Sequence, residues 1–451
     1  MIQLPEGAAF VMEKLTRAGY PAYVVGGCVR DAMLGVEPKD WDVCTAATPE
    51  EMQRVFAGCH VVETGLKHGT LTVVVNHVPY EVTTFRVDGA YTDHRHPDEV
   101  AFVTDVREDL ARRDFTINAM AYHPDTGLVD AFHGREDLAA GVIRCVGEPE
   151  QRFGEDALRI LRALRFASVY GFTMEERTAR AVHSLKRTLH GVAAERIRVE
   201  LGKLLRGRGA ETILRDYADV ITEVLPVLSP MLGFDQRTPY HRYDVWEHTI
   251  RAVGAVEPSE TLRWTMLLHD SGKPACFTLD DKGQGHAFGH GERSVAIARE
   301  VMACLKVDNA TRDRVLTLVA RHDMPLSDSP AALRRCLHDM GEETLRQLIE
   351  VQRADERAKG VNPPEVIDAR AQTLNAALDA VLAANPCVTL RQLALRGSDL
   401  AQAGVPAGRA VGECLQYLLE RVIEDTLPND RAALERAAAA WADNVKAAGR
   451  P

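Results

Sequence analysis

The stretch Val24–Asp31, which reads Val-Val-Gly-Gly-Cys-Val-Arg-Asp, most restricts how this chain can fold. Its two valines are apolar and β-branched, which favours a buried strand. Gly26 and Gly27 let the backbone come close to an anionic group, because no Cβ intervenes. Amide groups at a turn leading into a helix bind anions, and Arg30 would add a bidentate donor. The stretch therefore predicts a strand, a glycine turn and a helix arranged around a phosphate.

Three carboxylates follow this turn. The segment Lys39–Val43 is expected to form a second strand, so that Asp40 and Asp42 point to one face. Glu81 lies on a further strand expected over Tyr80–Phe85 and could lie beside them. Neighbouring carboxylates suit Mg²⁺, which prefers oxygen ligands and also binds nucleotide phosphates. The pattern predicts a metal centre for phosphoryl transfer. The alternative is an ordinary Gly-Gly turn with a solvated acidic strand.

Three motifs of this region resemble a known family. Gly-Gly-x-Val-Arg-Asp, Asp-x-Asp and Glu-Val-Thr-Thr-Phe-Arg are similar to the catalytic head of class II tRNA nucleotidyltransferases (CCA-adding enzymes) and bacterial poly(A) polymerases. The resemblance implies that Asp40, Asp42 and Glu81 are the metal carboxylates. It also covers the polar segment Arg86–Val103, expected as the loop that CCA-adding and A-adding members keep. Its family-like positions are Asp88, Tyr91, Asp93, Arg95 and Pro97, and we expect its two histidines, His94 and His96, to be solvated.

Two adjacent arginines precede the next apolar segment. In Leu110–Ala121, paired arginines and an asparagine could hold a triphosphate and a ribose. The alternative is a helix start with surface arginines. The run Arg-Arg-Asp-Phe-Thr-Ile-Asn-Ala is similar to the same family, which implies nucleotide-binding roles for Arg112, Arg113, Asp114 and Asn118.

The segment Arg152–Phe166 is expected to be one helix with an apolar stripe. Its charged residues recur every third position, as they do in a salt-bridged helix. Cytosine and adenine each present an amine donor beside a ring-nitrogen acceptor, so an aspartate next to an arginine would select them over uracil and guanine. The family resemblance implies this role for Asp156 and Arg159, and triphosphate contacts for Arg162 and Arg165. The stretch 194–201 is expected to begin a further helix.

From about residue 235 the pattern changes to histidines and aspartates. Their order is His, His-Asp, His, His, Asp, which resembles the HD phosphohydrolase domain. Imidazoles and carboxylates suit divalent metals such as Mg, Mn, Ni or Fe. We expect one or two such cations and hydrolysis of a phosphoester; the alternative is a structural spacer. The candidate ligands are His248, His269, Asp270, His290, His322 and Asp355.

Charge is unevenly distributed along the 451 residues. The net charge is −11, but residues 151–210 hold 13 Lys and Arg against 6 Asp and Glu, a net of +7, which leaves −18 elsewhere. A basic segment in an acidic protein fits a local contact with an RNA backbone, and a solvated helix is the alternative. The nine cysteines are scattered without a CxxC pair, which predicts reduced thiols and a cytoplasmic protein. We expect no signal peptide and no membrane span.

The sequence as a whole predicts an α+β protein in which a head with a small mixed sheet precedes helical domains. The expected domains are a nucleotidyltransferase head (1–149), a helical neck (150–234), an HD domain (235–340, with Asp355 on the following helix) and a body and tail for tRNA (341–451). The resemblance implies addition of CCA, or of the terminal A alone, to tRNA from CTP and ATP with Mg²⁺. The alternatives are a poly(A) polymerase and an HD phosphohydrolase with an RNA-binding head. The oligomeric state stays open.

Overall fold

The computed structural model describes residues 2–63, 65–66, 69–89 and 100–447. Contacts divide the chain into two compact units, the first formed by residues 1–229 with 303–307 and the second by 230–302 with 308–451. We describe each unit by itself, and the fourfold domain division stays a prediction. Within the described ranges, no helix is long and apolar enough to cross a membrane.

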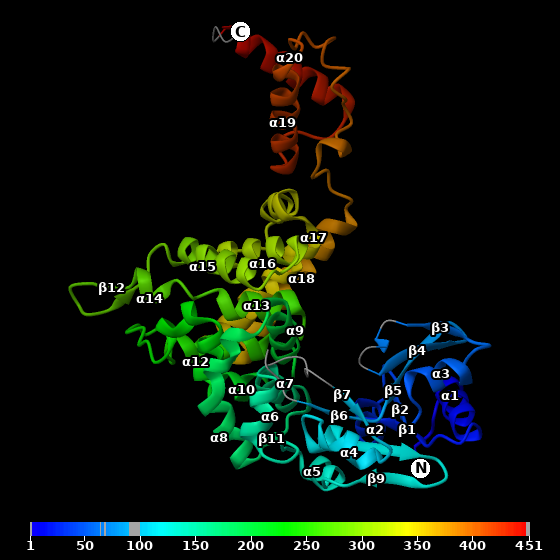
Figure 1. Cartoon of the computed structure of the whole chain (residues 1–451). Coiled ribbons are helices and arrows are strands. Elements are labelled where there is room, and N and C mark those ends of the chain that lie inside the picture. The colour runs from blue at the N-terminus through cyan, green and yellow to red at the C-terminus, as the bar shows by residue number, and fades with distance from the viewer. Residues whose placement is uncertain (1, 64, 67–68, 90–99, 448–451) are drawn as a thin grey trace. The chain divides into compact units, whose positions relative to one another are not determined.

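A seven-stranded mixed sheet forms the centre of the N-terminal part of the first unit (Figure 1). Its strand order is β3-β4-β5-β2-β1-β8-β9, in which β2 and β5 run parallel and all other neighbours are antiparallel. The predicted α+β class with a small mixed sheet is confirmed. The strands are β1 (Ala22–Val25), β2 (Val43–Thr45), β3 (His60–Val62), β4 (Thr70–Val75), β5 (Val78–Thr84), β8 (Met120–His123) and β9 (Gly127–Asp130).

Short helices cover this sheet. The N-terminal helix α1 packs its buried face against β1, β2 and β5. In α4, Val106 and Leu110 join a buried cluster with Val25, Cys44 and Ala121 of the sheet. The segment after Asp130 contains the helix α5. These helices are α1 (Glu6–Arg17), α2 (Gly27–Met33), α3 (Pro49–Val55), α4 (Val106–Ala111) and α5 (Gly134–Ala140).

The two ends of the expected loop 86–103 form short strands. Strands β6 (Arg86–Asp88) and β7 (Val100–Phe102) pair as an antiparallel ribbon, because β-branched residues and an aromatic side chain occupy these ends. Residues 90–99, with the family-like Tyr91, Asp93, Arg95 and Pro97 and the histidines His94 and His96, lie outside the described residues.

The helix predicted over 152–166 is two helices. Helix α6 ends at Glu155, Asp156 adopts an extended conformation (φ −139°, ψ 104°), and α7 begins at Leu158. The Asp156 carboxylate accepts a hydrogen bond from the Leu158 amide, and aspartate commonly competes with helical bonding in this way. The neck elements are α6 (Pro149–Glu155), α7 (Leu158–Tyr170), α8 (Glu176–Leu185), α9 (Ala194–Leu205), α10 (Ala210–Asp216) and α11 (Ala218–Val224), with a short pair of β10 (Val142–Ile143) and β11 (Thr173–Met174).

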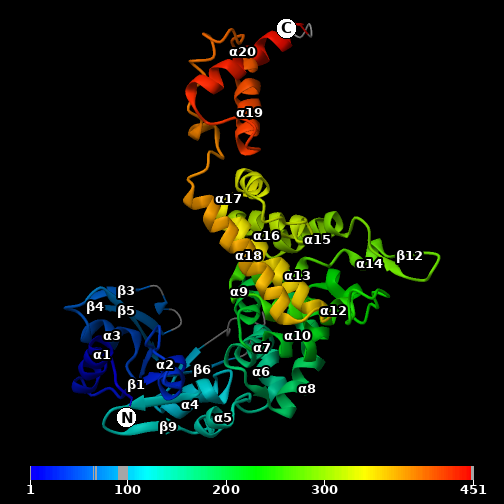
Figure 2. The same cartoon turned by 180° about the vertical axis from the view of Figure 1, so that it is seen from behind.

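The second unit is helical apart from one small hairpin. Helix α17 is interrupted at Gly341, whose φ of 74° lies in the left-handed region, and it packs along α12, α16 and α18 (Figure 2). Toward the C-terminus, α19 and α20 enclose their own apolar core. The elements are α12 (Val245–Ala255), α13 (Glu260–Leu268), α14 (Lys273–Cys276), β12 (Thr278–Leu279), β13 (Gly285–His286), α15 (His290–Cys304), α16 (Asn309–Arg321), α17 (Pro330–Lys359), α18 (Pro364–Ala383), α19 (Arg409–Ile423) and α20 (Arg431–Ala447).

A buried ion pair joins the sheet part of the first unit to its neck helices. Asp114 is 7% exposed and accepts from Arg162 Nε on α7 at 2.8 Å. Asn118 Nδ2 donates to the same carboxylate at 3.0 Å. Burial opposes ionisation of Asp114, yet Arg162 and Asn118 hold its pKa well below its usual range. The pair is therefore charged at neutral pH and ties two segments together.

We predict that Asp114→Ala lowers the free energy of unfolding by about 2–3 kcal/mol, because Arg162 and Asn118 lose a buried partner. Urea denaturation followed by circular dichroism measures this change. Glu148→Ala is the matched control, since it breaks an exposed pair with Arg177 and should cost less than about 1 kcal/mol. Equal losses in the two variants would contradict the assigned role.

Candidate functional site

The predicted carboxylates lie on two neighbouring parallel segments, with Asp40 and Asp42 just before β2 and Glu81 within β5. Val43 of β2 pairs with Val82 of β5, so Asp42 and Glu81 stand side by side one position earlier. The expected strand over Lys39–Val43 is wrong, because β2 begins only at Val43 and both aspartates lie in the irregular segment before it. The Asp42 carbonyl still accepts from the Val25 amide at 3.0 Å, which fixes this segment beside β1.

Like charges crowd around Asp42. Asp42 is an exposed residue. Partial burial of its carboxyl and the charges of Glu81 and Asp40 nevertheless raise the pKa of Asp42 to about 6, and Arg113 opposes this change. A divalent cation would relieve this repulsion, so the donor set fits Mg²⁺. Among the described residues, however, these three carboxylates do not form a group whose ligand atoms all lie within 4.8 Å of one another.

The glycine turn is built as the sequence predicts. Gly26 has a φ of 79°, and a Cβ at this position would lie 2.7 Å from Nη1 of Arg113. Arg30 on α2 is only 6% exposed and donates to Asn118 and Asp31. Its guanidinium also lies 5.1 Å from the ring centre of Phe166 on α7. Glycine at position 26 thus makes room for the Arg113 guanidinium directly behind the turn.

The paired arginines are anchored by a carboxylate that the sequence reasoning missed. Asp109 on α4 is fully buried and pairs with Arg112 at 2.8 Å and with Arg113 at 3.3 Å. Its spacing of three and four residues before the arginines is the signal that could have revealed it. Both guanidinium groups are therefore oriented before any nucleotide binds.

The base-reading pair predicted at Asp156 and Arg159 has a different arrangement. Asp156 pairs with Arg196 on α9 at 2.8 Å, whereas Arg159 donates to Glu155 and to the Arg152 carbonyl. The roles of Arg196, and of Glu200, which pairs with Arg165 at 2.7 Å, were not predicted. Both residues lie in the stretch 194–201 that was expected only to begin a helix.

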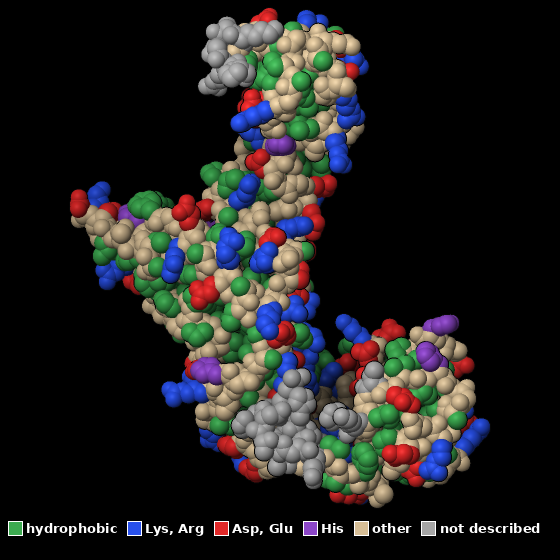
Figure 3. Space-filling model, turned by 45° about the horizontal axis from the view of Figure 1, so that its top comes forward, with side chains coloured by type: hydrophobic (Ala, Val, Ile, Leu, Met, Phe, Trp, Pro, Cys, Tyr) green, Lys and Arg blue, Asp and Glu red, His purple; other side chains and the backbone are tan. Residues whose placement is uncertain are grey.

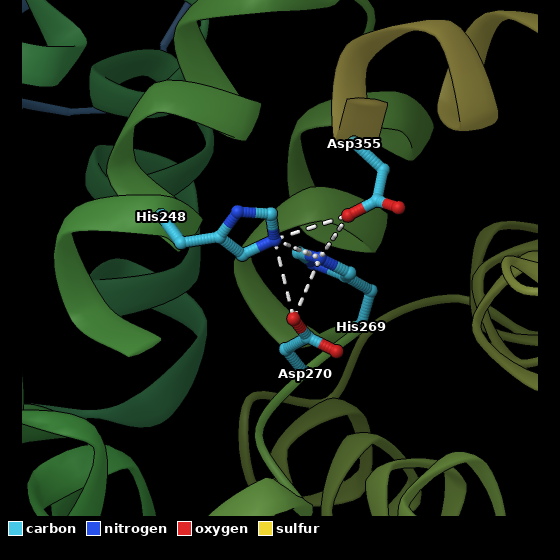
Figure 4. A group of neighbouring side chains, drawn as sticks. All are labelled: His248, His269, Asp270 and Asp355. Carbon is cyan, nitrogen blue, oxygen red and sulfur yellow. Dashed lines mark hydrogen bonds and ion pairs between the residues drawn. The ribbon is translucent and has the colours of Figure 1, made fainter. Parts of the chain in front are cut away.

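The six predicted histidine and aspartate ligands come together in the second unit. Figure 4 shows His248, His269, Asp270 and Asp355 directed toward a common point. His248 Nε2 lies 3.2 Å from Asp270 Oδ2 and 3.0 Å from Asp355 Oδ1. These four side chains are almost fully buried. Such an arrangement of two imidazoles and two carboxylates fits a divalent metal.

Asp270 also belongs to a second group. Its other oxygen, Oδ1, lies 3.4 Å from His290 Nε2 and 3.6 Å from His322 Nε2. The outer nitrogens of His269, His290 and His322 face the carbonyls of Met266, Ala287 and Val319 at 2.8–2.9 Å, which directs each Nε2 inward as a ligand. Asp270 is thus shared by two groups of potential ligands, one at each of its oxygens.

The charge state of Asp270 also fits a metal. Burial opposes its ionisation, but His269 and Lys273 hold its pKa well below the usual range. Neither of its buried oxygens accepts a hydrogen bond of normal geometry. Burial likewise opposes protonation of His269, whereas Asp270 raises its pKa to about 10. A cation would replace that proton and satisfy the buried oxygens.

Two lysines beside the cluster were not predicted. Lys273 Nζ lies 2.7 Å from Asp270 Oδ2, and Lys359 Nζ lies 3.0 Å from Asp355 Oδ2. Each stands three or four residues after its aspartate, a spacing that is visible in the sequence. His241, also missed, lies 3.2 Å from Lys273, and burial with the Lys273 charge lowers its pKa to about 3.

Three domain descriptions match consecutive parts of the chain. Residues 22–144 match the poly A polymerase head domain, and 171–231 match the probable RNA and SrmB-binding site of polymerase A. Residues 292–438 match the putative domain 2 of tRNA nucleotidyltransferase. These descriptions do not name an HD domain, so that resemblance rests on the order and geometry of the six ligands.

Curated relatives and solved structures identify the same family, some over half of the chain and others over nearly all of it. A CCA-adding enzyme of Limosilactobacillus reuteri is 47% identical over 48% of this chain and 54% of its own length. The structure of the Bacillus stearothermophilus CCA-adding enzyme in complex with CTP has a TM-score of 0.72 and 29% identity, and the match covers 98% of each chain. A CCA-adding enzyme of Levilactobacillus brevis is 35% identical over 95% of this chain and 96% of its own length. The predicted family is confirmed: the chain belongs to the CCA-adding enzymes, which are tRNA nucleotidyltransferases.

Proposed function

We propose that the first unit adds nucleotides to the 3′ end of tRNA, building CCA from CTP and ATP. The observation that carries this proposal is that Asp42, just before β2, lies next to Glu81 of the parallel strand β5 and beside the strand that leads into the glycine turn at Gly26. A homologous enzyme of the same family was solved in complex with CTP, and a Thermotoga maritima member of the same fold was solved with tRNA. The cytoplasmic location stays a prediction.

The head residues suit this reaction. Asp40 and Asp42 would hold Mg²⁺, which supplies charge stabilisation for phosphoryl transfer. Glu81 would help to activate the 3′-hydroxyl of the RNA, whose oxygen bonds to the α-phosphorus as the bond to pyrophosphate breaks. The triphosphate and ribose would lie near Gly26, Gly27, Arg30, Arg112, Arg113, Asp114, Asn118, Arg162 and Arg165.

Base choice would lie with Asp156 and Arg159. Ion pairing with Arg196 orients the Asp156 carboxylate, and Glu155 orients Arg159, so each group is held before a base arrives. An acceptor from Asp156 and a donor from Arg159 would match the edges of cytosine and adenine. The rival reading, a poly(A) polymerase, is disfavoured because the curated relatives at 33–35% identity over nearly the whole chain are CCA-adding enzymes.

Asp42→Ala is predicted to abolish the addition of both C and A, with a loss on the order of 1,000-fold, because one centre carries out both transfers. Radiolabelled CTP and ATP incorporation into tRNA measures this loss. Asp125→Ala is the control. It removes an exposed aspartate in the turn between β8 and β9 and should leave the rate of addition unchanged. Near-normal addition of either nucleotide by Asp42→Ala would rule out the proposed centre.

Asp156→Ala is expected to weaken base choice more than catalysis. A well-placed base contact contributes roughly 1–3 kcal/mol of discrimination, so UTP and GTP use should rise about tenfold or more relative to CTP and ATP. The measurement compares kcat/KM for all four nucleotides on one tRNA. The exposed Glu150→Gln on α6 serves as the control. Unchanged selectivity in Asp156→Ala would remove the base-reading role.

For the second unit we propose a metal-dependent phosphoester hydrolysis. It is supported by the shared Asp270, which lies between His248 and His269 on one side and His290 and His322 on the other. A 2′,3′-cyclic phosphate at a damaged RNA end is a suitable ester: water adds to phosphorus, one ring P–O bond breaks, the freed hydroxyl takes a proton, and a phosphate monoester remains. The bound cations would supply the activated water.

The two activities should separate. The double variant His269→Ala/Asp270→Ala is predicted to lose bound divalent metal and cyclic-phosphate hydrolysis, while tRNA addition stays within about twofold. Elemental analysis and product chromatography provide the measurements. His338→Ala, which removes a histidine outside the cluster, should keep both properties. A wild-type protein without metal at this cluster, and inactive with Mg²⁺, Mn²⁺, Ni²⁺ and Fe²⁺, would make the segment a structural spacer.

A further inference from the structure

A cavity of about 510 Å³ opens beside the histidine–aspartate cluster, entirely within the second unit. Its inner wall includes the ligands Asp270, His290, His322 and Asp355. This volume falls in the range of pockets that hold small molecules of nucleotide size. The cluster is therefore reached through a pocket that can contact more than the reacting phosphate.

The inner end of the cavity is prepared for an anion. Lys273 and Lys359 both line it, and each pairs with a cluster aspartate. Lys273 is fixed further by a hydrogen bond to Gln236 at 2.9 Å. Two ammonium groups held next to a candidate metal centre favour a phosphate there.

The outer end of the cavity carries exposed aromatic rings. Phe288 is 80% exposed and Tyr240 is 66% exposed, and both line the cavity. The ring of Phe288 stacks on His286 with a centroid separation of 5.2 Å and an interplanar angle of 6°. His286 Nε2 in turn lies 3.2 Å from Asp280 Oδ2, and this contact holds the His286 ring in place. His286 thus covers one face of the Phe288 ring, and most of the remaining Phe288 surface is exposed to solvent.

The stacked pair of His286 and Phe288 lies close in sequence to the candidate metal ligand His290. Phe288 stands two residues before the ligand His290, and His286 ends the hairpin formed by β12 and β13. In Figure 3 the projection that corresponds to this hairpin carries hydrophobic, histidine and charged side chains together. A flat ring stacked on Phe288 would have its attached sugar and phosphate within the same cavity as the cluster.

We propose that this cavity binds a nucleotide, with its base stacked on Phe288 and its phosphoester at the cluster beside Lys273 and Lys359. This inference rests on the proposed hydrolysis and names its substrate class. Stacking on an aromatic face accepts any base, so recognition is independent of sequence. The nucleotide is either free or the last residue of an RNA strand, since both present the same base, sugar and phosphate.

Binding to the metal-free full-length protein tests the stacking directly. The probes are adenosine 3′-monophosphate and ribose 3-phosphate, measured by equilibrium dialysis in EDTA. The nucleotide is expected to bind about tenfold more tightly than the base-free sugar phosphate. Phe288→Ala should remove that difference, and Phe288→Trp should keep it. Leu279→Ala is the matched control, because Leu279 is an exposed apolar residue of the same hairpin outside the cavity lining.

Equal affinity of the wild type for both probes, or an unchanged preference in Phe288→Ala, would overturn the proposal. A parallel assay compares hydrolysis of adenosine 2′,3′-cyclic phosphate with hydrolysis of an RNA oligonucleotide ending in the same group. Phe288→Ala should raise KM on the preferred ester about tenfold and leave kcat nearly constant. Preference for the oligonucleotide assigns the RNA end, and preference for the free ester assigns the mononucleotide. Base-dependent binding without hydrolysis of any ester would reject only the proposed hydrolysis.

Discussion

Carboxylates that the fold holds close together are the constraint on which both candidate sites depend. In the head, the parallel pairing of β2 with β5 brings Asp42 beside Glu81, and the pKa of Asp42 rises to about 6. In the second unit, Asp270 is buried without a normal hydrogen bond to either oxygen. A divalent cation would bind both groups of carboxylates and lower the repulsion among them.

In the first unit, residues far apart in sequence are joined in one network that includes the proposed nucleotide-binding residues. Asp114 holds Asn118 and Arg162, while Arg30 contacts Asn118 and the rings of Phe166 and Tyr170. A single network thus links the glycine turn, the arginine segment and helix α7. Because the network is largely buried, it orients these groups before substrate binds, which lowers the entropic cost of recognition.

Much of this arrangement could be predicted from the sequence, because strand patterning, the Gly-Gly turn and the spacing of ligands are local signals. The helix break at Asp156 was not predicted, and the ion pair that holds its carboxylate involves Arg196, forty residues away. The start of β2 at Val43 also depends on pairing with β1 and β5. Lys273 and Lys359 follow their aspartates at a spacing that is visible in the sequence. Only the fold brings both lysines to the same cavity beside the histidine–aspartate cluster.

The central claim is that one head site builds CCA on tRNA without a nucleic-acid template. The most direct measurement offers tRNAs ending at the discriminator base, at C and at CC, each with a single nucleoside triphosphate, and sequences the products. The account predicts C on the first two substrates, A on the third, and neither U nor G on any. Runs of A on all three ends, or no extension at all, would contradict it.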